Sequence, residues 1–169
     1  GNISGTDELG SIEYGVDHLE TPLLVVLGHT HCGAVTAVAT GAEVHGSIPA
    51  LLHSIEPVVA KVKSAHGSLT GDALIESCVT ENVWNTIEQI LTHSSAVQQR
   101  ARAGKVEVVG AIYDIEAGTV AWLGQHPQQG ELLAVTVQET HHAAEPTANG
   151  TDADHAKFMQ RLEKIRLTH

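Results

Sequence analysis

Residues 22–39 read PLLVVLGHTHCGAVTAVA, and this stretch decides the fold. Residues 22–28 form a short apolar run that contains β-branched valines and does not alternate with polar residues. Such a run predicts a strand that is buried on both faces, as in a parallel sheet. A polar turn follows at residues 29–33, and residues 34–39 then predict a helix. This order is typical of open α/β sheets, in which ligand sites gather beyond the carboxyl ends of the strands.

The turn carries two side chains with metal-binding chemistry, His29 and Cys32. Their His-x-x-Cys spacing allows both side chains to reach one Zn²⁺, and imidazole and thiolate are the ligands that this ion prefers. Cys32 also lies where the predicted helix begins, and the free N–H groups there favour thiolate over thiol. From the pattern alone, the alternative is a buried cysteine beside a loop histidine.

Three further helices are predicted from the spacing of apolar residues and from capping residues. The first covers residues 6–19, and the second covers residues 48–62 with a kink or restart at Pro57. Thr80 is the predicted cap of a longer helix. The buried stripe of that helix is Val83, Ile87, Ile90, Leu91 and Val97.

The second half of the chain begins with a predicted hairpin and continues into an extension. Residues 106–113 predict a second buried strand, and residues 119–123 predict a short strand that folds back on it. Residues 125–150 have little periodicity and predict an extended arm or loop, in which His141-His142 is interpreted as solvated. Residues 154–167 predict an amphipathic helix, suited either to core packing or to docking on a second subunit, with an apolar stripe of Phe158, Met159, Leu162 and Ile165.

Composition excludes several classes of function. The chain has 169 residues with 20 acidic and 9 basic side chains, and the resulting formal charge of −11 repels nucleic acid and anionic membrane surfaces. No uncharged apolar run is long enough to cross a bilayer. Two cysteines do not make a disulfide scaffold, so we expect a reducing compartment, the cytoplasm.

Separated segments of the chain resemble the β-class carbonic anhydrases, in the order in which that family has them. These segments are GNI at 1–3, LGSIEYGV at 9–16, LVVLGHTHCGAV at 24–35, ENV at 81–83 and VVGAIYDIE at 108–116. The resemblance covers residues 1–124 as one domain and leaves residues 125–169 as a C-terminal extension. It implies an α/β fold with a mostly parallel sheet flanked by helices, followed by the C-terminal arm and helix.

The resemblance also implies a cofactor and a reaction. In that family the histidine and cysteine of the Gly-His-x-x-Cys-Gly segment bind zinc, which here means His29 and Cys32. Zinc-bound hydroxide then hydrates CO₂ reversibly to bicarbonate. His31 falls between the ligands and is interpreted as a pocket or surface histidine, while the residue that relays the proton is left open. Relatives with the same zinc framework hydrolyse carbon disulfide or carbonyl sulfide, which is a further alternative.

One family motif is absent from the 169 residues. Upstream of Gly1-Asn2 the family carries Cys-x-Asp-x-Arg, whose cysteine is the third protein ligand of zinc. Cys78 does not match that position and is interpreted as a small buried hydrophobe. We therefore expect either an incomplete chain or one that exchanges elements with a partner, and a homodimer or higher homo-oligomer rather than a monomer. The alternative function is a carbonic-anhydrase-like scaffold with an incomplete, inactive metal site that acts as a binding or assembly module.

Overall fold

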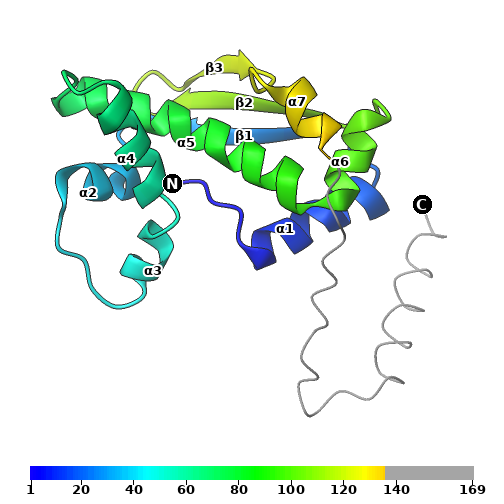
Figure 1. Cartoon of the computed structure of the whole chain (residues 1–169), viewed down its shortest axis with the longest axis horizontal. Coiled ribbons are helices and arrows are strands. Elements are labelled where there is room, and N and C mark those ends of the chain that lie inside the picture. Colours follow the sequence, from blue (N-terminus) through cyan, green and yellow to red (C-terminus); the bar gives the residue numbers. More distant parts are fainter. Residues whose placement is uncertain (136–169) are drawn as a thin grey trace, which may run out of the picture. The chain divides into compact units, whose positions relative to one another are not determined.

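The computed structural model describes residues 1–135 (Figure 1). The chain alternates between helices and strands, in the order α1 (Thr6–Glu13), the π-helical turn η1 (Tyr14–His18), β1 (Leu23–His29), α2 (Gly33–Thr40), α3 (Ile48–Leu52), α4 (Glu56–Ala65), α5 (Gly71–His93), α6 (Ser95–Arg102), β2 (Glu107–Asp114), β3 (Thr119–Gly124) and α7 (Gln129–Ala134). No helix within these residues is both long enough and apolar enough to cross a membrane.

The described strands form one sheet in the order β1-β2-β3. β1 and β2 run parallel, in a register that pairs His29 with Tyr113, and β3 folds back antiparallel on β2. The expectation of an α/β fold is confirmed, and the pairing of these three strands is mixed. β1 therefore lies at an edge of the sheet, and His29 lies at its carboxyl end.

Helix α5 packs across one face of the sheet, against β1 and β2 (Figure 1). Gly28 permits this close approach, because a Cβ added there would lie 2.8 Å from Cγ2 of Val83 and 3.0 Å from Cδ1 of Ile112. The face of α5 toward the sheet carries Val83 and Ile87, which are fully buried. The amino-terminal half of the same helix packs in a second apolar cluster with α2 and α4.

The opposite face of the sheet is open among the described residues. Leu23 and Leu27 of β1 are 44% and 48% exposed, so the prediction of a strand buried on both faces is wrong. The pairing of β2 with both neighbours continues this face through Tyr113, Val120 and Trp122, of which Trp122 is 63% exposed. A strand without alternation is consistent with two apolar faces, but only the face toward α5 is covered here.

Two predicted elements differ from the observed ones. Helix α5 begins at Gly71 rather than after Thr80, because apolar residues 74–79 extend the stripe onto the second cluster. Val97 lies in a separate helix, α6, whose first turn is capped by the Ser94 hydroxyl, an acceptor 3.2 Å from the Val97 nitrogen.

The predicted arm also contains structure that its sequence does not indicate. Residues 129–134 form helix α7 rather than an extended segment, and its carbonyls are bound from α6. The Gln98 side chain donates to the Leu132 and Val135 carbonyls at 3.1 and 2.7 Å. The His141-His142 pair and the predicted helix at 154–167 lie outside the described residues.

Candidate metal centre

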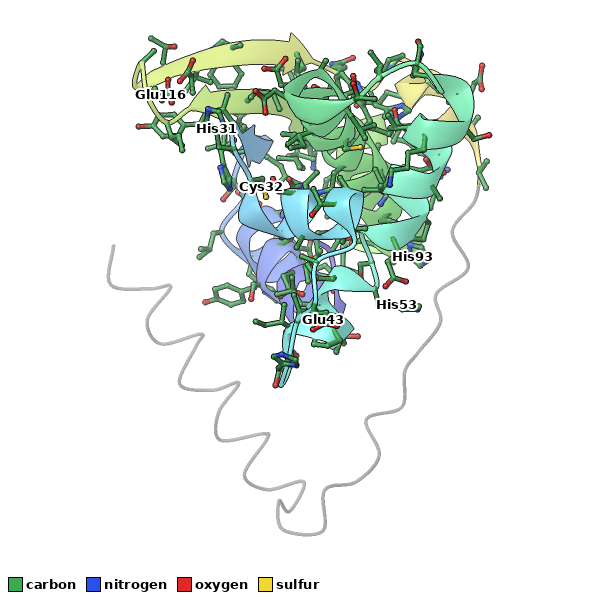
Figure 2. The ribbon with its side chains drawn as sticks, turned by 90° about the vertical axis from the view of Figure 1, so that its left-hand side faces the viewer. His31, Cys32, Glu43, His53, His93 and Glu116 are labelled. Atoms are coloured by element: carbon green, nitrogen blue, oxygen red, sulfur yellow. The ribbon has the colours of Figure 1, made fainter. Side chains whose placement is uncertain are left out.

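The two predicted zinc ligands lie at either end of one short turn. His29 is the last residue of β1, and Cys32 is the residue that precedes the first turn of α2. Figure 2 shows Cys32 at the start of α2 and His31 toward the β2–β3 hairpin. The sequence pattern thus places an imidazole and a thiol at the carboxyl end of a strand, where α/β proteins hold ligands.

The His29 ring is oriented by a hydrogen bond that leaves one nitrogen available. Its Nδ1 lies 2.8 Å from the Thr30 carbonyl oxygen. Because a carbonyl oxygen only accepts, Nδ1 carries the proton and Nε2 keeps its lone pair. Metal-binding histidines commonly have their second nitrogen fixed in this way. His29 therefore presents Nε2 as a ready metal ligand.

The Cys32 thiol has an environment that favours the thiolate. Cys32 is 2% exposed, and burial opposes ionisation, but hydrogen bonds and a nearby positive charge outweigh it. The charged amino group of Gly1, the first residue of the sequence, donates to Sγ at 2.9 Å, and the backbone N–H groups of Val35 and Ala34 in the first turn of α2 also bind it. Together they lower the pKa of the Cys32 thiol. A thiolate is the form of cysteine that binds zinc.

Thr30 ties the turn to the neighbouring hairpin. Its backbone N–H donates to the Tyr113 carbonyl at 2.9 Å, and its hydroxyl oxygen accepts from the Ile115 N–H at 3.1 Å. The hairpin turn is itself closed by Asp114, whose Oδ1 accepts from the N–H groups of Glu116 and Ala117 at 2.9 and 3.0 Å. The turn between the two candidate ligands is thus held from outside its own sequence.

His31 has a surface position, in agreement with its interpretation. Its backbone is left-handed, with φ at 55°, and its side chain is mostly exposed. Nε2 lies 3.5 Å from a carboxylate oxygen of Glu116. Both residues line a surface pocket of about 230 Å³ whose other acidic members are Asp72, Glu76 and Asp114.

Cys78 is fully buried in α5, and burial raises the pKa of its thiol, which confirms the interpretation of a buried hydrophobe. Within residues 1–135, no three or more histidine, cysteine or acidic side chains are grouped in a way that could hold a metal ion. His29 and Cys32 therefore remain the two candidate zinc ligands within the described part of the chain.

Sequence reasoning missed a buried polar network beside Cys32. Asn82 and Thr86 of α5 are 2% and 4% exposed, and both bind Asn2. The signal was present in the sequence, since residues four apart share a helix face and this pair lies within the apolar stripe of α5. Two polar residues on a buried stripe require partners.

These elements define an α/β protein with a histidine–cysteine turn at the carboxyl end of an edge strand. The family described as carbonic anhydrase matches residues 1–120. The chain therefore belongs to the β-carbonic anhydrase family.

Individual relatives agree with this assignment. Carbonic anhydrase 2 of Mycobacterium tuberculosis is 34% identical over 120 residues, which cover 70% of this chain and 56% of the relative. The chain thus spans about half the length of this curated relative. The β-carbonic anhydrase CcaA superposes with a TM-score of 0.61 at 27% identity, over 73% of this chain and 60% of the other. A structure described as one of two tetrameric β-carbonic anhydrases from Sordaria macrospora shares the fold, with a TM-score of 0.60 at 22% identity, over 72% of this chain and 63% of the other.

Proposed function

We propose that this chain binds zinc through His29 and Cys32 and takes part in the reversible hydration of CO₂ to bicarbonate. The observation that carries the proposal is the turn itself, which combines a histidine with a free Nε2 and a cysteine with a lowered pKa. The names of the curated relatives support the same activity.

The donor set of the turn fits zinc. An imidazole nitrogen and a thiolate are the ligands that zinc prefers, and both are prepared by hydrogen bonds before any metal arrives. When bound, zinc supplies a Lewis acid that lowers the pKa of water to roughly 7. The Thr30 carbonyl holds the proton on Nδ1 of His29, and the N–H groups at the start of α2 stabilise the negative sulfur of Cys32.

We further propose that the third protein ligand comes from an extended segment other than residues 1–135 that pairs with the outer edge of β1. That edge has no neighbouring strand among the described residues. A groove of about 470 Å³ runs along it, between β1 residues 24–27, α1 and α5. A strand that added here in parallel to β1 would end on the same side of the sheet as His29, because carboxyl ends of parallel strands share one edge.

The test compares the two cysteines of the chain. Wild type, Cys32→Ser and Cys78→Ser are dialysed, and zinc content and stopped-flow CO₂ hydration are measured on each sample. We expect about one zinc per chain and hydration in wild type and Cys78→Ser, and neither in Cys32→Ser. Wild-type protein without zinc and with background hydration contradicts the proposal, and so does equal loss in both variants.

A second candidate function is a zinc-binding or assembly module without catalysis. The observation that favours it is that, among the described residues, no third histidine, cysteine or acidic side chain is grouped with the two candidate ligands. Such a module retains zinc in wild type and loses it in Cys32→Ser, but its CO₂ hydration equals the uncatalysed rate. The same two measurements therefore separate the two functions.

A further inference from the structure

We propose that Asp114 is a positioning residue of the metal centre. It closes the turn of the β2–β3 hairpin, and the closed turn holds the residues between His29 and Cys32 through the Thr30 hydroxyl. The inference rests on the proposed zinc function, since it concerns how the two candidate ligands are held relative to each other. Among the described residues, the Asp114 carboxylate binds the backbone of its own hairpin and neither of the two ligands.

The Asp114 side chain and backbone together close the hairpin turn. Oδ1 accepts from the backbone N–H groups of Glu116 and Ala117 at 2.9 and 3.0 Å. The Asp114 carbonyl oxygen accepts from the Gly118 N–H at 2.9 Å. Aspartate favours turns of this kind because its short side chain reaches the N–H groups that follow it. Ile115 lies inside the closed turn, so the direction of its own N–H is fixed as well.

The closed hairpin turn meets the metal-binding turn at Thr30. The Ile115 N–H donates to the Thr30 hydroxyl oxygen at 3.1 Å, and the Thr30 N–H donates to the Tyr113 carbonyl at 2.9 Å. The Thr30 carbonyl oxygen accepts from Nδ1 of His29 at 2.8 Å. All three polar groups of Thr30 are thus engaged, and the end of the hairpin holds two of them.

The hairpin holds a conformation that the metal-binding turn does not adopt readily on its own. His31 has φ at 55°, a left-handed conformation that few residues other than glycine adopt. Such residues persist when the surrounding structure fixes them from several sides. Nε2 of His31 lies 3.5 Å from the Glu116 carboxylate, and Figure 2 shows both side chains at the turn of the hairpin. The backbone of His31 sets the separation of His29 and Cys32, so a loosened hairpin changes that separation.

The test uses two variants of Asp114 and a matched control from the same surface pocket. Asp114→Ala removes the acceptor of the turn, whereas Asp114→Asn keeps an oxygen in the same place and removes only the charge. Asp72→Ala is the control, because Asp72 lines the same pocket and carries the same charge but belongs to the first turn of α5. Zinc affinity is measured by chelator competition, and the ligand geometry is followed by the visible absorption of the Co²⁺-loaded protein.

We expect Asp114→Ala to lose zinc affinity by about tenfold, the lower end of the effect of outer partners of metal ligands, and to shift the cobalt absorption. Asp114→Asn and Asp72→Ala should remain close to wild type in both measurements. A folded Asp114→Ala with unchanged affinity and spectrum overturns the inference, and so does an equal loss in Asp114→Asn. Wild-type protein that binds neither metal instead overturns the proposed function.

A double variant tests the route through Thr30. In a Thr30→Val background the hydrogen bond to Ile115 is absent, so adding Asp114→Ala should change zinc affinity and cobalt absorption little further. Effects that add in full would show that Asp114 does not act through the Thr30 hydroxyl, which contradicts the inference.

Asp114→Glu keeps the inference falsifiable if Asp114→Ala does not fold. It keeps the charge, but its carboxylate lies one methylene further from the backbone and does not close the same turn. We expect the same direction of change in zinc affinity and cobalt absorption as in Asp114→Ala. Wild-type values for both in Asp114→Glu would show that the closed turn does not position the ligands.

Discussion

Thr30 lies between the two candidate zinc ligands and supports the turn that carries them. Its carbonyl fixes the ring of His29, and its hydroxyl joins the turn to the β2–β3 hairpin. Replacing Thr30 by valine keeps the size and branching of the side chain but removes the hydroxyl. The effect of this substitution therefore reports on one hydrogen bond.

For Thr30→Val we expect the free energy of unfolding to fall by about 0.5–1.5 kcal/mol, which is the usual net contribution of one hydrogen bond to stability. We also expect weaker zinc binding, because the turn between His29 and Cys32 loses its tie to Ile115. Urea unfolding and chelator competition measure the two effects. Thr40→Val is the control, since its hydroxyl donates within α2 to Thr36. Equal effects in both variants would contradict the assigned role.

His126 predicts a pH dependence of stability. Burial beside Trp84 lowers the pKa of its imidazole, and its Nδ1 accepts from the Gln128 N–H at 3.0 Å, which requires an unprotonated nitrogen. The folded state thus binds this proton more weakly than the unfolded chain does. The contribution of His126 to stability is present at neutral pH and is lost as pH falls from about 6.5 through the lowered folded pKa.

We therefore expect the unfolding free energy to fall between about pH 7 and pH 5 more steeply in wild type than in His126→Asn. Asparagine keeps an acceptor for Gln128 but does not titrate in this range. Urea unfolding at a series of pH values provides the comparison. Parallel curves for the two proteins would show that His126 has the same pKa folded and unfolded.

For individual residues, the sequence predicts the two candidate zinc ligands better than it predicts the residues that hold the surrounding backbone in place. His29 and Cys32 follow from a short spacing, and their neighbours along the chain are sufficient to propose them. Asn82 and Thr86 act on Asn2 from about eighty residues away, as a contact that no local pattern contains. Their burial on α5 was a signal that a partner existed, but not which partner.

At the scale of elements, the contact between α5 and β1 depends on Gly28. For Gly28→Ala we expect a loss of about 1–3 kcal/mol of unfolding free energy, because the new methyl group meets Val83 and Ile112. Gly33→Ala is the control, since a Cβ at that helical position meets nothing within 4 Å. Chemical unfolding measures both variants. Equal stability of the two would mean that α5 moves away from the sheet at little cost.

Contacts between elements, rather than local sequence signals, determine where α5 begins and why α7 forms. Thr80 satisfies the rule for a capping residue, yet it lies inside α5, because Leu74 and Ile75 pack against the second apolar cluster. Helix α7 forms although its six residues have little periodicity, because side chains of α6 bind its carbonyl groups. Both differences come from contacts between elements, which periodicity along the chain does not record.

For the whole molecule, the open face of the sheet predicts association. Leu27, Val120 and Trp122 lie on this face and are exposed among the described residues. Exposed apolar patches of this kind mark interaction sites. We expect the chain to form a homodimer or higher homo-oligomer through this face, as predicted from the sequence, and sedimentation velocity measures it.

In Trp122→Glu we expect a larger monomer fraction than in wild type, because a charge on the face opposes its burial. Gln99→Glu adds the same charge at an exposed position of α6 and should leave the sedimentation profile unchanged. A monomeric wild type at all concentrations, or identical sedimentation profiles for Trp122→Glu and wild type, would show that this face takes no part in association.

The free edge of β1 has a consequence for handling the protein. Residues 23–27 read LLVVL, without charge, proline or glycine, and they border a row of backbone donors and acceptors that has no neighbouring strand within residues 1–135. Identical segments of that composition stack into cross-β fibrils when their edges are not covered. A preparation of this chain alone should therefore acquire thioflavin-positive material with time and concentration. A strand that pairs with this edge therefore also prevents the stacking of β1 segments into amyloid fibrils.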